Sequence, residues 1–147
     1  MKDENWWLVA DIGGTNARFW GVTPGSIEPV WQGYYLVNEY PEFADVLTHA
    51  LQDVAVALDA NVSPQKVCFA VACPTVLDRF VFTNSHWNFT IEEVIEKTGC
   101  SLVSVINDFG AVARAVPKHK VPDLTPVGDG QISSKHPNVV LGAGPGL

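Results

Sequence analysis

The sequence predicts an α/β fold in which a mixed sheet, with its first three strands antiparallel, is covered by helices on both faces. The first observation is a set of three strand-like apolar runs near the N-terminus, at residues 6–11, 17–22 and 30–37. The first two runs are joined through Gly13 and Gly14, which is typical of a hairpin. The second observation is that helix-like and strand-like segments alternate after these runs, an order that places helices against a sheet.

The first helix is expected to begin after Pro41. From Phe43 to Leu58, apolar residues recur at every third or fourth position, which places them on one face of a helix. Residues 67–72 form a continuous apolar run, which is typical of a strand buried on both faces. A short strand is expected at residues 79–83, because this run follows a turn-like segment.

A second helix is expected at residues 91–97. Thr90 and Glu93 have the spacing of a capping box, and Gly99 is a residue type that commonly ends helices. The elements expected next are a strand at residues 102–106 and a helix at residues 109–116 that ends before Pro117.

The composition of the chain changes after residue 117. Lys, Pro, Gly, Asp and Ser dominate as far as Asn138, and residues 139–141 then predict a new strand that leads into a loop at Gly142. We therefore predict a first domain at residues 1–117, followed at 118–147 by a hinge and the beginning of a second domain.

Composition and charge exclude several classes of protein. With 47% hydrophobic and 17% charged residues, the 147-residue chain can bury a sizeable core. Nine basic and 16 acidic residues give a net charge of -7, which argues against a nucleic-acid partner. No apolar run approaches the roughly 18 residues of a membrane helix, and nothing before Trp6 resembles a signal peptide. We therefore expect a cytoplasmic protein without a membrane partner, whose three cysteines are reduced and lie in the core.

The segment Asp11-Ile12-Gly13-Gly14-Thr15-Asn16-Ala17-Arg18 connects the first two strands. Glycines let backbone N–H groups come close to phosphate oxygens, and Thr15 can add a hydroxyl donor. Asp11 can hold a hydrated Mg²⁺ that neutralises a polyphosphate. The alternative is a plain Gly-Gly hairpin turn after an aspartate that ends a strand.

A second candidate feature is Asn107-Asp108, at the carboxyl end of a buried strand. Ligands of open α/β sheets gather outside the carboxyl ends of the strands, so a catalytic base is expected there. Asp108 can accept the proton of an attacking hydroxyl, and the amide of Asn107 can both donate to and accept from hydroxyls. The alternative is that Asp108 only caps the helix that follows.

Polar groups also follow the strand at residues 67–72. They occur in Ala72-Cys73-Pro74 and Thr83-Asn84, and an aromatic ring follows at Trp87. A tryptophan at such a position more often belongs to a core than to a platform for a sugar ring.

Taken together, these motifs resemble the bacterial glucokinase family within the sugar kinase, actin and Hsp70 superfamily. The matching stretches are residues 10–18, 70–74, 83–84 with Trp87, 106–109 with Ala111, and 142–144. They occur in the order of the family and with similar spacing along the whole chain.

This resemblance implies a ribonuclease-H-like (actin-like ATPase) domain and ATP-dependent phosphorylation of glucose at its 6-hydroxyl, with ATP and Mg²⁺ as cofactors. The reaction takes place in a cleft between two such domains. By the same resemblance, Asp108 is the general base, and the sugar-binding residues are Asn107, Pro74 and Asn84. The implied nucleotide-binding residues are Asp11, Ile12, Gly13, Gly14, Thr15, Asn16 and Arg18, together with Gly142, Gly144 and Gly146 of a facing loop.

The sequence departs from the family in two respects. Pro145 stands where the family usually has threonine, and proline removes a hydroxyl and a backbone N–H from a phosphate-binding turn. The family also continues well beyond residue 147. We therefore expect the chain by itself to have negligible turnover. We also expect it to self-associate, as a homodimer or otherwise, through apolar surface that the rest of a relative covers.

Two other functions are compatible with the sequence. One is a kinase for another hexose, since the residues that distinguish sugar epimers lie largely outside the matched part. The other is a non-catalytic module that binds a sugar or a nucleotide. A sugar-responsive transcription regulator of related fold is disfavoured, because no helix-turn-helix precedes Trp6 and the chain is acidic.

Overall fold

The structure is a computed structural model that describes residues 5–58, 63–118, 125–131, 133, 135–137 and 139–142. The chain divides into two compact units, Met1–Asp108 and Phe109–Leu147. The first unit ends before the predicted domain boundary at residue 117, which stays a prediction.

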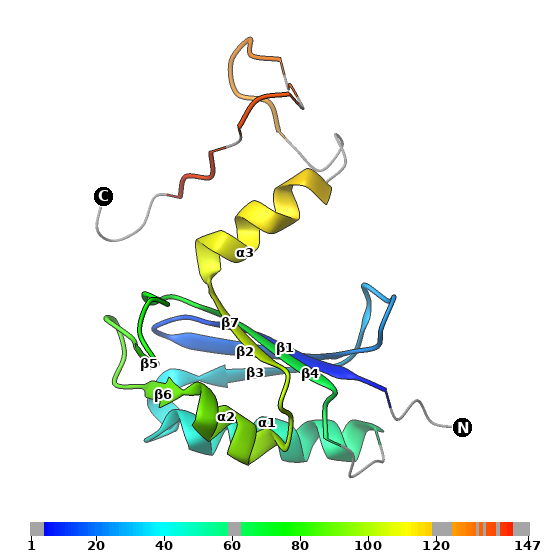
Figure 1. Ribbon diagram of the computed structural model, residues 1–147, viewed down its shortest axis with the longest axis vertical. Helices are drawn as coiled ribbons and strands as arrows, with labels where there is room; N and C mark the ends of the chain where they lie inside the picture. Colours follow the sequence, from blue (N-terminus) through cyan, green and yellow to red (C-terminus); the bar gives the residue numbers. More distant parts are fainter. Residues whose placement is uncertain are drawn as a thin grey trace. The chain divides into compact units, whose positions relative to one another are not determined.

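A five-stranded sheet forms the centre of the first unit (Figure 1). Its strands are β1 (Trp7–Ile12), β2 (Asn16–Val22), β3 (Pro29–Leu36), β4 (Lys66–Val71) and β7 (Val103–Asn107). Their order in the sheet is β3-β2-β1-β4-β7. The pairs β1–β2 and β2–β3 are antiparallel, whereas β1–β4 and β4–β7 are parallel. The predicted mixed sheet with three antiparallel first strands is therefore confirmed.

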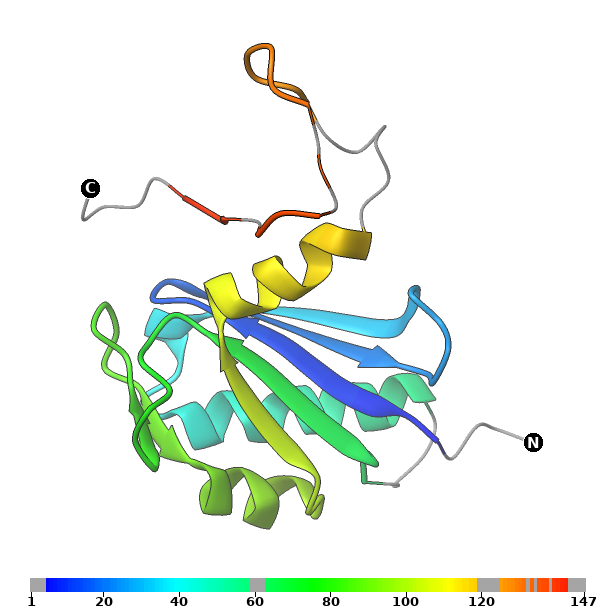
Figure 2. The same cartoon turned by 45° about the horizontal axis from the view of Figure 1, so that its top comes forward.

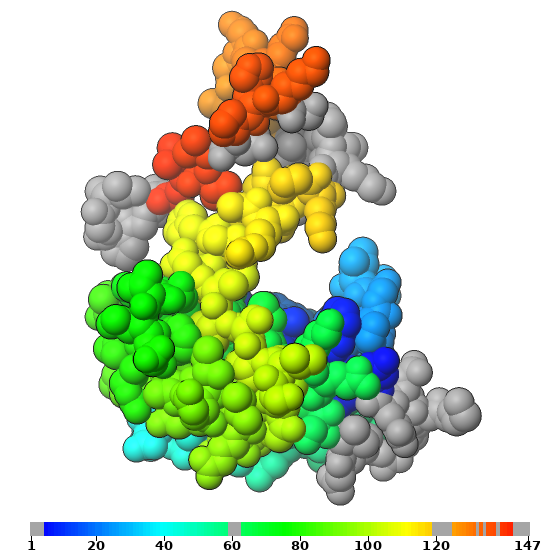
Figure 3. All heavy atoms as spheres, viewed as in Figure 1, coloured from blue at the N-terminus to red at the C-terminus, as the bar shows by residue number. Residues whose placement is uncertain are grey.

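Two helices and a small hairpin complete this unit. The helices are α1 (Phe43–Leu58) and α2 (Ile91–Thr98), and the hairpin consists of β5 (Arg79–Val81) and β6 (Asn88–Thr90). A 3-10 turn, η1 (Val37–Glu39), connects β3 to α1. The atoms of α2 and of the hairpin form a continuous packed surface in the space-filling view (Figure 3).

The ends of α2 follow from local sequence. The Thr90 hydroxyl accepts from the Glu93 amide at 3.2 Å, and the Glu93 carboxylate accepts from the Thr90 amide at 2.9 Å, so the predicted capping box is formed. Gly99 ends the helix with a φ of 68°, a left-handed conformation that glycine adopts without steric cost.

The core lies between one face of the sheet and both helices. Alternate residues of β1, among them Leu8 and Ile12, point to this face and are fully buried. Phe43 of α1 stacks on Phe89 of β6 with ring centroids 4.2 Å apart. Figure 2 shows α1 and α2 on the same side of the sheet. Among the described residues of this unit no helix covers the other face, so the predicted second helical layer remains a prediction.

The second unit begins with α3 (Asp108–Ala115, whose first residue still belongs to the first unit) and continues as η2 (Val116–Lys118). The strand expected at residues 139–141 was wrong, because no strand is formed there. A strand needs a neighbouring strand for its amide and carbonyl groups. The described part of this unit provides none, and Val139 and Leu141 are 79% and 89% exposed.

Two further findings bear on the remaining expectations from composition. Of the three cysteines, Cys73 and Cys100 are buried and Cys68 is half-buried. No helix in the described part of the chain is both long and apolar enough to cross a membrane.

Candidate functional site

The two sequence motifs lie at the same end of the sheet. In the parallel ladders Ile12 is level with Val71, and Val71 is level with Asn107. The residues that follow β1 and β7, Gly13 and Asp108, therefore leave the sheet at the same edge, with the end of β4 between them. Two inter-strand steps of about 4.8 Å separate the two strands by roughly 10 Å.

The loop at residues 13–15, called here the 13–15 loop, closes the hairpin between β1 and β2. The Gly13 amide donates to the carbonyl oxygen of Asn16 at 2.9 Å, and the Thr15 carbonyl accepts from the amide of Val37 at 2.9 Å. Among the described residues, the amides of Gly14 and Thr15 and the Thr15 hydroxyl have no hydrogen-bond partner. The Gly-Gly hairpin and a group of unpaired donors are therefore present in the same loop.

The loop does not need its two glycines for a left-handed backbone conformation. Neither Gly13 nor Gly14 has a positive φ. A Cβ atom on Gly13 would make only an ordinary contact, at 3.5 Å from the Asn16 oxygen. A Cβ atom on Gly14 would lie 2.8 Å from both the Cβ and the carbonyl oxygen of Asn84, so only glycine fits there. The Gly13 amide is used inside the hairpin, and the assignment of Gly13 to nucleotide binding stays a prediction.

Asp11 and Arg18 face each other across the hairpin. They are directly paired in the β1–β2 register, and the Arg18 guanidinium is 3.3 Å from Asp11 Oδ2. Both side chains are about half exposed, so the ion pair contributes little to stability. Arg18 also lies over the ring of Tyr34 at 5.7 Å, and the Tyr34 hydroxyl donates to Asn16 Oδ1. These contacts fix the side chains beside the 13–15 loop.

Asp108 and Asn107 are held against the segment that follows β4. The side-chain amide of Asn107 donates to the carbonyl oxygen of Cys73 at 3.4 Å. Burial, and after it the negative charge of Asp108, raises the pKa of the Cys73 thiol, which places the Asp108 carboxylate on the side of Cys73. Asp108 is also the first residue of α3, where a carboxylate is favoured by the helix dipole. Its interpretation as a helix-terminal residue and its interpretation as a base are compatible.

The remaining sugar-site candidates of the first unit lie near these groups. Pro74 is exposed and directly follows Cys73 at the end of β4. Asn84 is exposed in the loop at residues 82–87, called here the 82–87 loop, which connects β5 to β6. Trp87 of the same loop is 1% exposed and packs edge-on against Phe43, so it is a core residue, as favoured from the sequence.

Asp11 remains the residue predicted to hold a hydrated magnesium ion. Asp11 is the last residue but one of β1, two residues before the 13–15 loop begins, and within the described residues only its Oδ2 atom is paired, with Arg18. The described residues contain no group of three or more His, Cys, Asp or Glu side chains that could enclose a metal ion. A single carboxylate suits an ion that keeps several waters and also binds phosphate oxygens, as Mg²⁺ does.

The candidates in the second unit are described only within that unit. Gly142 lies against the ring of Phe109, which a Cβ atom would approach to 2.5 Å. Gly144, Gly146 and Pro145 lie outside the described residues. Their assignment to a facing phosphate loop therefore stays a prediction.

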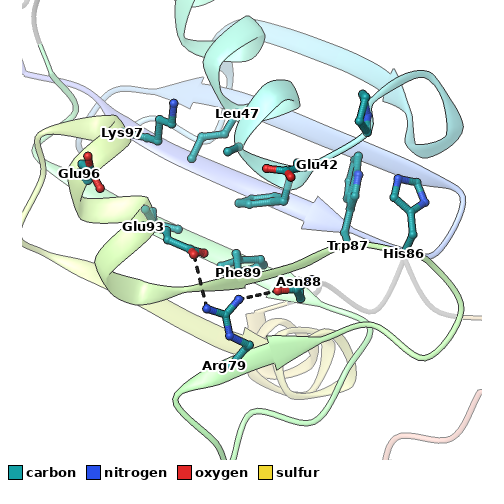
Figure 4. Close-up of a pocket in the computed structure, with 14 residues that line it drawn as sticks. Glu42, Leu47, Arg79, His86, Trp87, Asn88, Phe89, Glu93, Glu96 and Lys97 are labelled. Carbon is teal, nitrogen blue, oxygen red and sulfur yellow. Dashed lines mark hydrogen bonds and ion pairs between the residues drawn. The ribbon is translucent and has the colours of Figure 1, made fainter.

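A cavity of about 530 Å³ lies between α1, α2 and β6 (Figure 4). Its floor is aromatic, with Phe43, Trp87 and Phe89. At its rim the charges are partly neutralised within the protein, because Arg79 is 3.5 Å from Glu93 and also donates to Asn88 at 2.5 Å. This cavity is on the helix-covered face of the sheet and is lined by His86 and Trp87 of the 82–87 loop, but by neither Asp108 nor any residue of the 13–15 loop, and we do not assign the site to it.

Several contributing residues escaped prediction because their contacts are long-range. Tyr34 supports Asn16, and Val37 supports Thr15, although each pair is separated by about twenty residues. Cys73 holds Asn107 through its backbone carbonyl, which no residue pattern can signal. The nearest available signal was the position of Cys73 directly after a buried strand.

The comparisons with known proteins show which family the chain resembles. A sequence model of the glucokinase family matches residues 8–147. The chain is 40% identical to a glucokinase from Marinobacter nauticus, in an alignment that covers all of this chain and 44% of that protein. It is 38% identical to a glucokinase from Salmonella arizonae, in an alignment that covers 95% of this chain and 42% of that protein. The chain thus spans less than half the length of the curated relatives it matches.

Solved structures show the same fold. A glucokinase from an Antarctic psychrotroph is 28% identical and superposes with a TM-score of 0.72, covering 88% of this chain and 40% of that protein. A ROK family transcriptional regulator superposes with a TM-score of 0.53 over 78% of this chain and 31% of that protein, at 15% identity, which is a likeness of fold alone. The fold is thus the actin-like ATPase fold of sugar kinases, and the match over residues 8–147 shows that the chain belongs to the glucokinase family.

Proposed function

We propose that the whole protein transfers the γ-phosphoryl group of ATP to the 6-hydroxyl of glucose. In this proposal the present chain supplies a loop for the ATP phosphates and the carboxylate that accepts the hydroxyl proton. The observation that carries the proposal is the shared edge of the sheet at which Gly13 and Asp108 follow two parallel strands. Relatives named glucokinase at 36% to 40% identity support glucose as the sugar.

Asp108 is the proposed general base. As the sugar oxygen attacks the γ-phosphorus, its O–H bond breaks and the proton passes to the carboxylate of Asp108. The new bond between oxygen and phosphorus forms while the bond from the γ-phosphorus to the bridging oxygen breaks, and ADP leaves with that electron pair. Positioning of both substrates supplies most of the acceleration in such transfers.

Asn107, Pro74 and Asn84 are the proposed sugar contacts. Asn107 is suited to this role because its side chain is steadied by the Cys73 carbonyl and combines donor and acceptor groups. Pro74 and Asn84 are exposed in the loops that follow β4 and β5.

The proposed phosphate contacts are the amides of Gly14 and Thr15 and the Thr15 hydroxyl. Flanking residues Ile12, Gly13 and Asn16 shape this loop, and Arg18 holds Asp11 beside it. Asp11 is proposed to hold Mg²⁺ through water, and such an ion neutralises charge on the phosphates. Gly142, Gly144 and Gly146 remain the proposed facing loop.

The location and assembly of the protein are also part of the proposal. We propose a cytoplasmic protein that contacts neither nucleic acid nor membrane. The net charge of -7 disfavours binding to nucleic acid. Self-association as a homodimer remains the proposed assembly. Several large apolar side chains on the described surface are exposed, including Ile27 and Val76 at 98% and 86%.

The decisive experiment is a coupled assay of the longest product of the gene, with glucose, mannose and N-acetylglucosamine compared at equal concentration. Glucose-dependent consumption of ATP is expected, with lower kcat/KM for the other two sugars. The 147-residue chain assayed beside it is expected to show negligible turnover. A preference for mannose or N-acetylglucosamine would favour another hexose kinase, and binding without turnover of any sugar would favour a non-catalytic module.

A further inference from the structure

The 13–15 loop touches the 82–87 loop at one point, where Gly14 lies against Asn84. A Cβ atom on Gly14 would lie 2.8 Å from the Asn84 carbonyl oxygen and 3.2 Å from its carbonyl carbon. Real Cβ atoms do not approach backbone so closely, and a main-chain carbonyl cannot move aside as the end of a flexible side chain can. The two loops are therefore in direct contact through their backbones.

The 82–87 loop is itself firmly held. The indole Nε1 of Trp87 donates to the carbonyl oxygen of Tyr40 at 3.0 Å, and His86 Nε2 donates to the same oxygen at 2.9 Å. The Phe82 amide also donates to the Trp87 carbonyl at 3.3 Å across the base of the loop. Trp87 is 1% exposed, and Figure 4 shows it beside His86 at the end of the loop. These contacts hold the two ends of the loop and so limit how far Asn84 can move away from Gly14.

The 13–15 loop is held by the same stretch of chain. The Val37 amide donates to the Thr15 carbonyl, and Tyr40, only three residues later, accepts the two bonds from the 82–87 loop. The residues between them form η1, which closes with a bond from the Tyr40 amide to the Val37 carbonyl at 3.3 Å. The segment at residues 37–40 is thus hydrogen-bonded to both loops, and the two loops also contact each other at Gly14 and Asn84.

We propose that Gly14 and Trp87 are positioning residues that fix the 13–15 loop and the 82–87 loop relative to each other, so that the nucleotide and sugar sites are coupled. The coupling of the two sites rests on the proposed function, in which the 13–15 loop binds phosphates and Asn84 contacts sugar. The mechanical contact itself does not depend on it. Trp87 acts here through its indole N–H and not as a surface for a sugar ring, since it is buried.

The contact between the two loops is tested on the 147-residue chain by ¹⁵N NMR. The Trp87 indole resonance is assigned as the signal that is missing in Trp87→Phe. Gly14→Ala is expected to shift the backbone amides of residues 83–87 and the Trp87 indole signal. Gly13→Ala is the matched steric control, because its Cβ atom has room, and it is expected to shift only amides near residue 13. Equal patterns in the two alanine variants would overturn the proposal.

Should Gly14→Ala fail to fold, Trp87→Phe provides the second test and is expected to shift the amides of Gly14 and Thr15. Unchanged Gly14 and Thr15 amides in that variant would contradict the inference.

The coupling of the sites is tested by the kinetics of the longest gene product. Gly14→Ala is expected to lower kcat/KM on the order of 10²-fold, because displacement by about 1 Å has effects of this size. Trp87→Phe is expected to raise the KM for ATP as well as for glucose, although its side chain touches neither. A rise in one KM alone would refute coupling while leaving the kinase proposal intact. Absence of turnover in the wild-type protein would refute the kinase proposal and, with it, the coupling of the substrate sites. The NMR comparison would still decide whether the two loops are in contact.

Discussion

The side-chain amide of Asn107, the last residue of β7, donates to the backbone carbonyl of Cys73, two residues beyond the end of β4. This bond ties together two neighbouring strand ends just outside the sheet. It holds the segment that carries Pro74 beside the residue that precedes Asp108. The proposed sugar contacts and the proposed base thus share one support.

Replacement of Asn107 by alanine is expected to remove this support. The bond is long at 3.4 Å, so its loss should lower the free energy of unfolding by only about 0.5 to 1 kcal/mol. The KM for glucose should rise more than the KM for ATP, because the proposed sugar contacts move. Urea unfolding of the chain and steady-state kinetics of the longest gene product measure the two effects. An equal rise in both KM values would argue against a sugar-side role for Asn107.

Asp108→Asn tests the proposed base. Asparagine preserves the size of the side chain but cannot accept the hydroxyl proton, so kcat is expected to fall on the order of 10² to 10⁴-fold. The KM for ATP should change little, since the 13–15 loop lies two strands away. Rapid-quench measurement of the chemical step checks this expectation, with thermal unfolding to verify the fold. Retention of most of the wild-type kcat would exclude Asp108 as the base.

Features governed by neighbouring residues could be predicted from the sequence. The capping box at Thr90, the helix end at Gly99 and the β1–β2 hairpin depend on residues close together in the chain, and all three are formed. Apolar periodicity also located α1, because its buried residues recur at helical spacing.

Features governed by distant partners could not be predicted in the same way. Strand β6 was missed because Asn88 to Thr90 has a strand conformation only by pairing with β5. The run at residues 139–141 has strand composition but forms no strand among the described residues. The necessity of Gly14 follows from Asn84, seventy residues away, and not from its own backbone angles.

Thr90→Ala is expected to destabilise the first unit by about 1 kcal/mol, because it removes the hydroxyl that accepts from the Glu93 amide at the start of α2. The free energy of unfolding is measured in urea by circular dichroism. Thr83→Ala is a suitable control, since Thr83 is exposed and its hydroxyl has no partner among the described residues. Equal effects of the two substitutions would show that the cap contributes nothing.

Tyr35→Phe is expected to change how stability depends on pH. Burial, followed by the hydrogen bond to Asp53 and the charge of that residue, raises the pKa of Tyr35 above its ordinary value of 10.0. Its hydroxyl donates to Asp53 Oδ2 at 2.6 Å, and the side chain is 6% exposed. Below pH 10 the tyrosine is protonated in the folded and unfolded states, so this contribution is fully present.

Above about pH 10 the unfolded chain loses the Tyr35 proton while the folded chain keeps it. The free energy of unfolding should then fall by about 1.4 kcal/mol per pH unit from this group alone. Phenylalanine has no such proton, so Tyr35→Phe should be less stable than wild type by about 1 to 2 kcal/mol at neutral pH. That difference should shrink as the pH rises from about 10 to 11. Urea unfolding of both proteins across this range measures it, and a difference that stays constant would show that the pKa of Tyr35 is not raised in the folded protein.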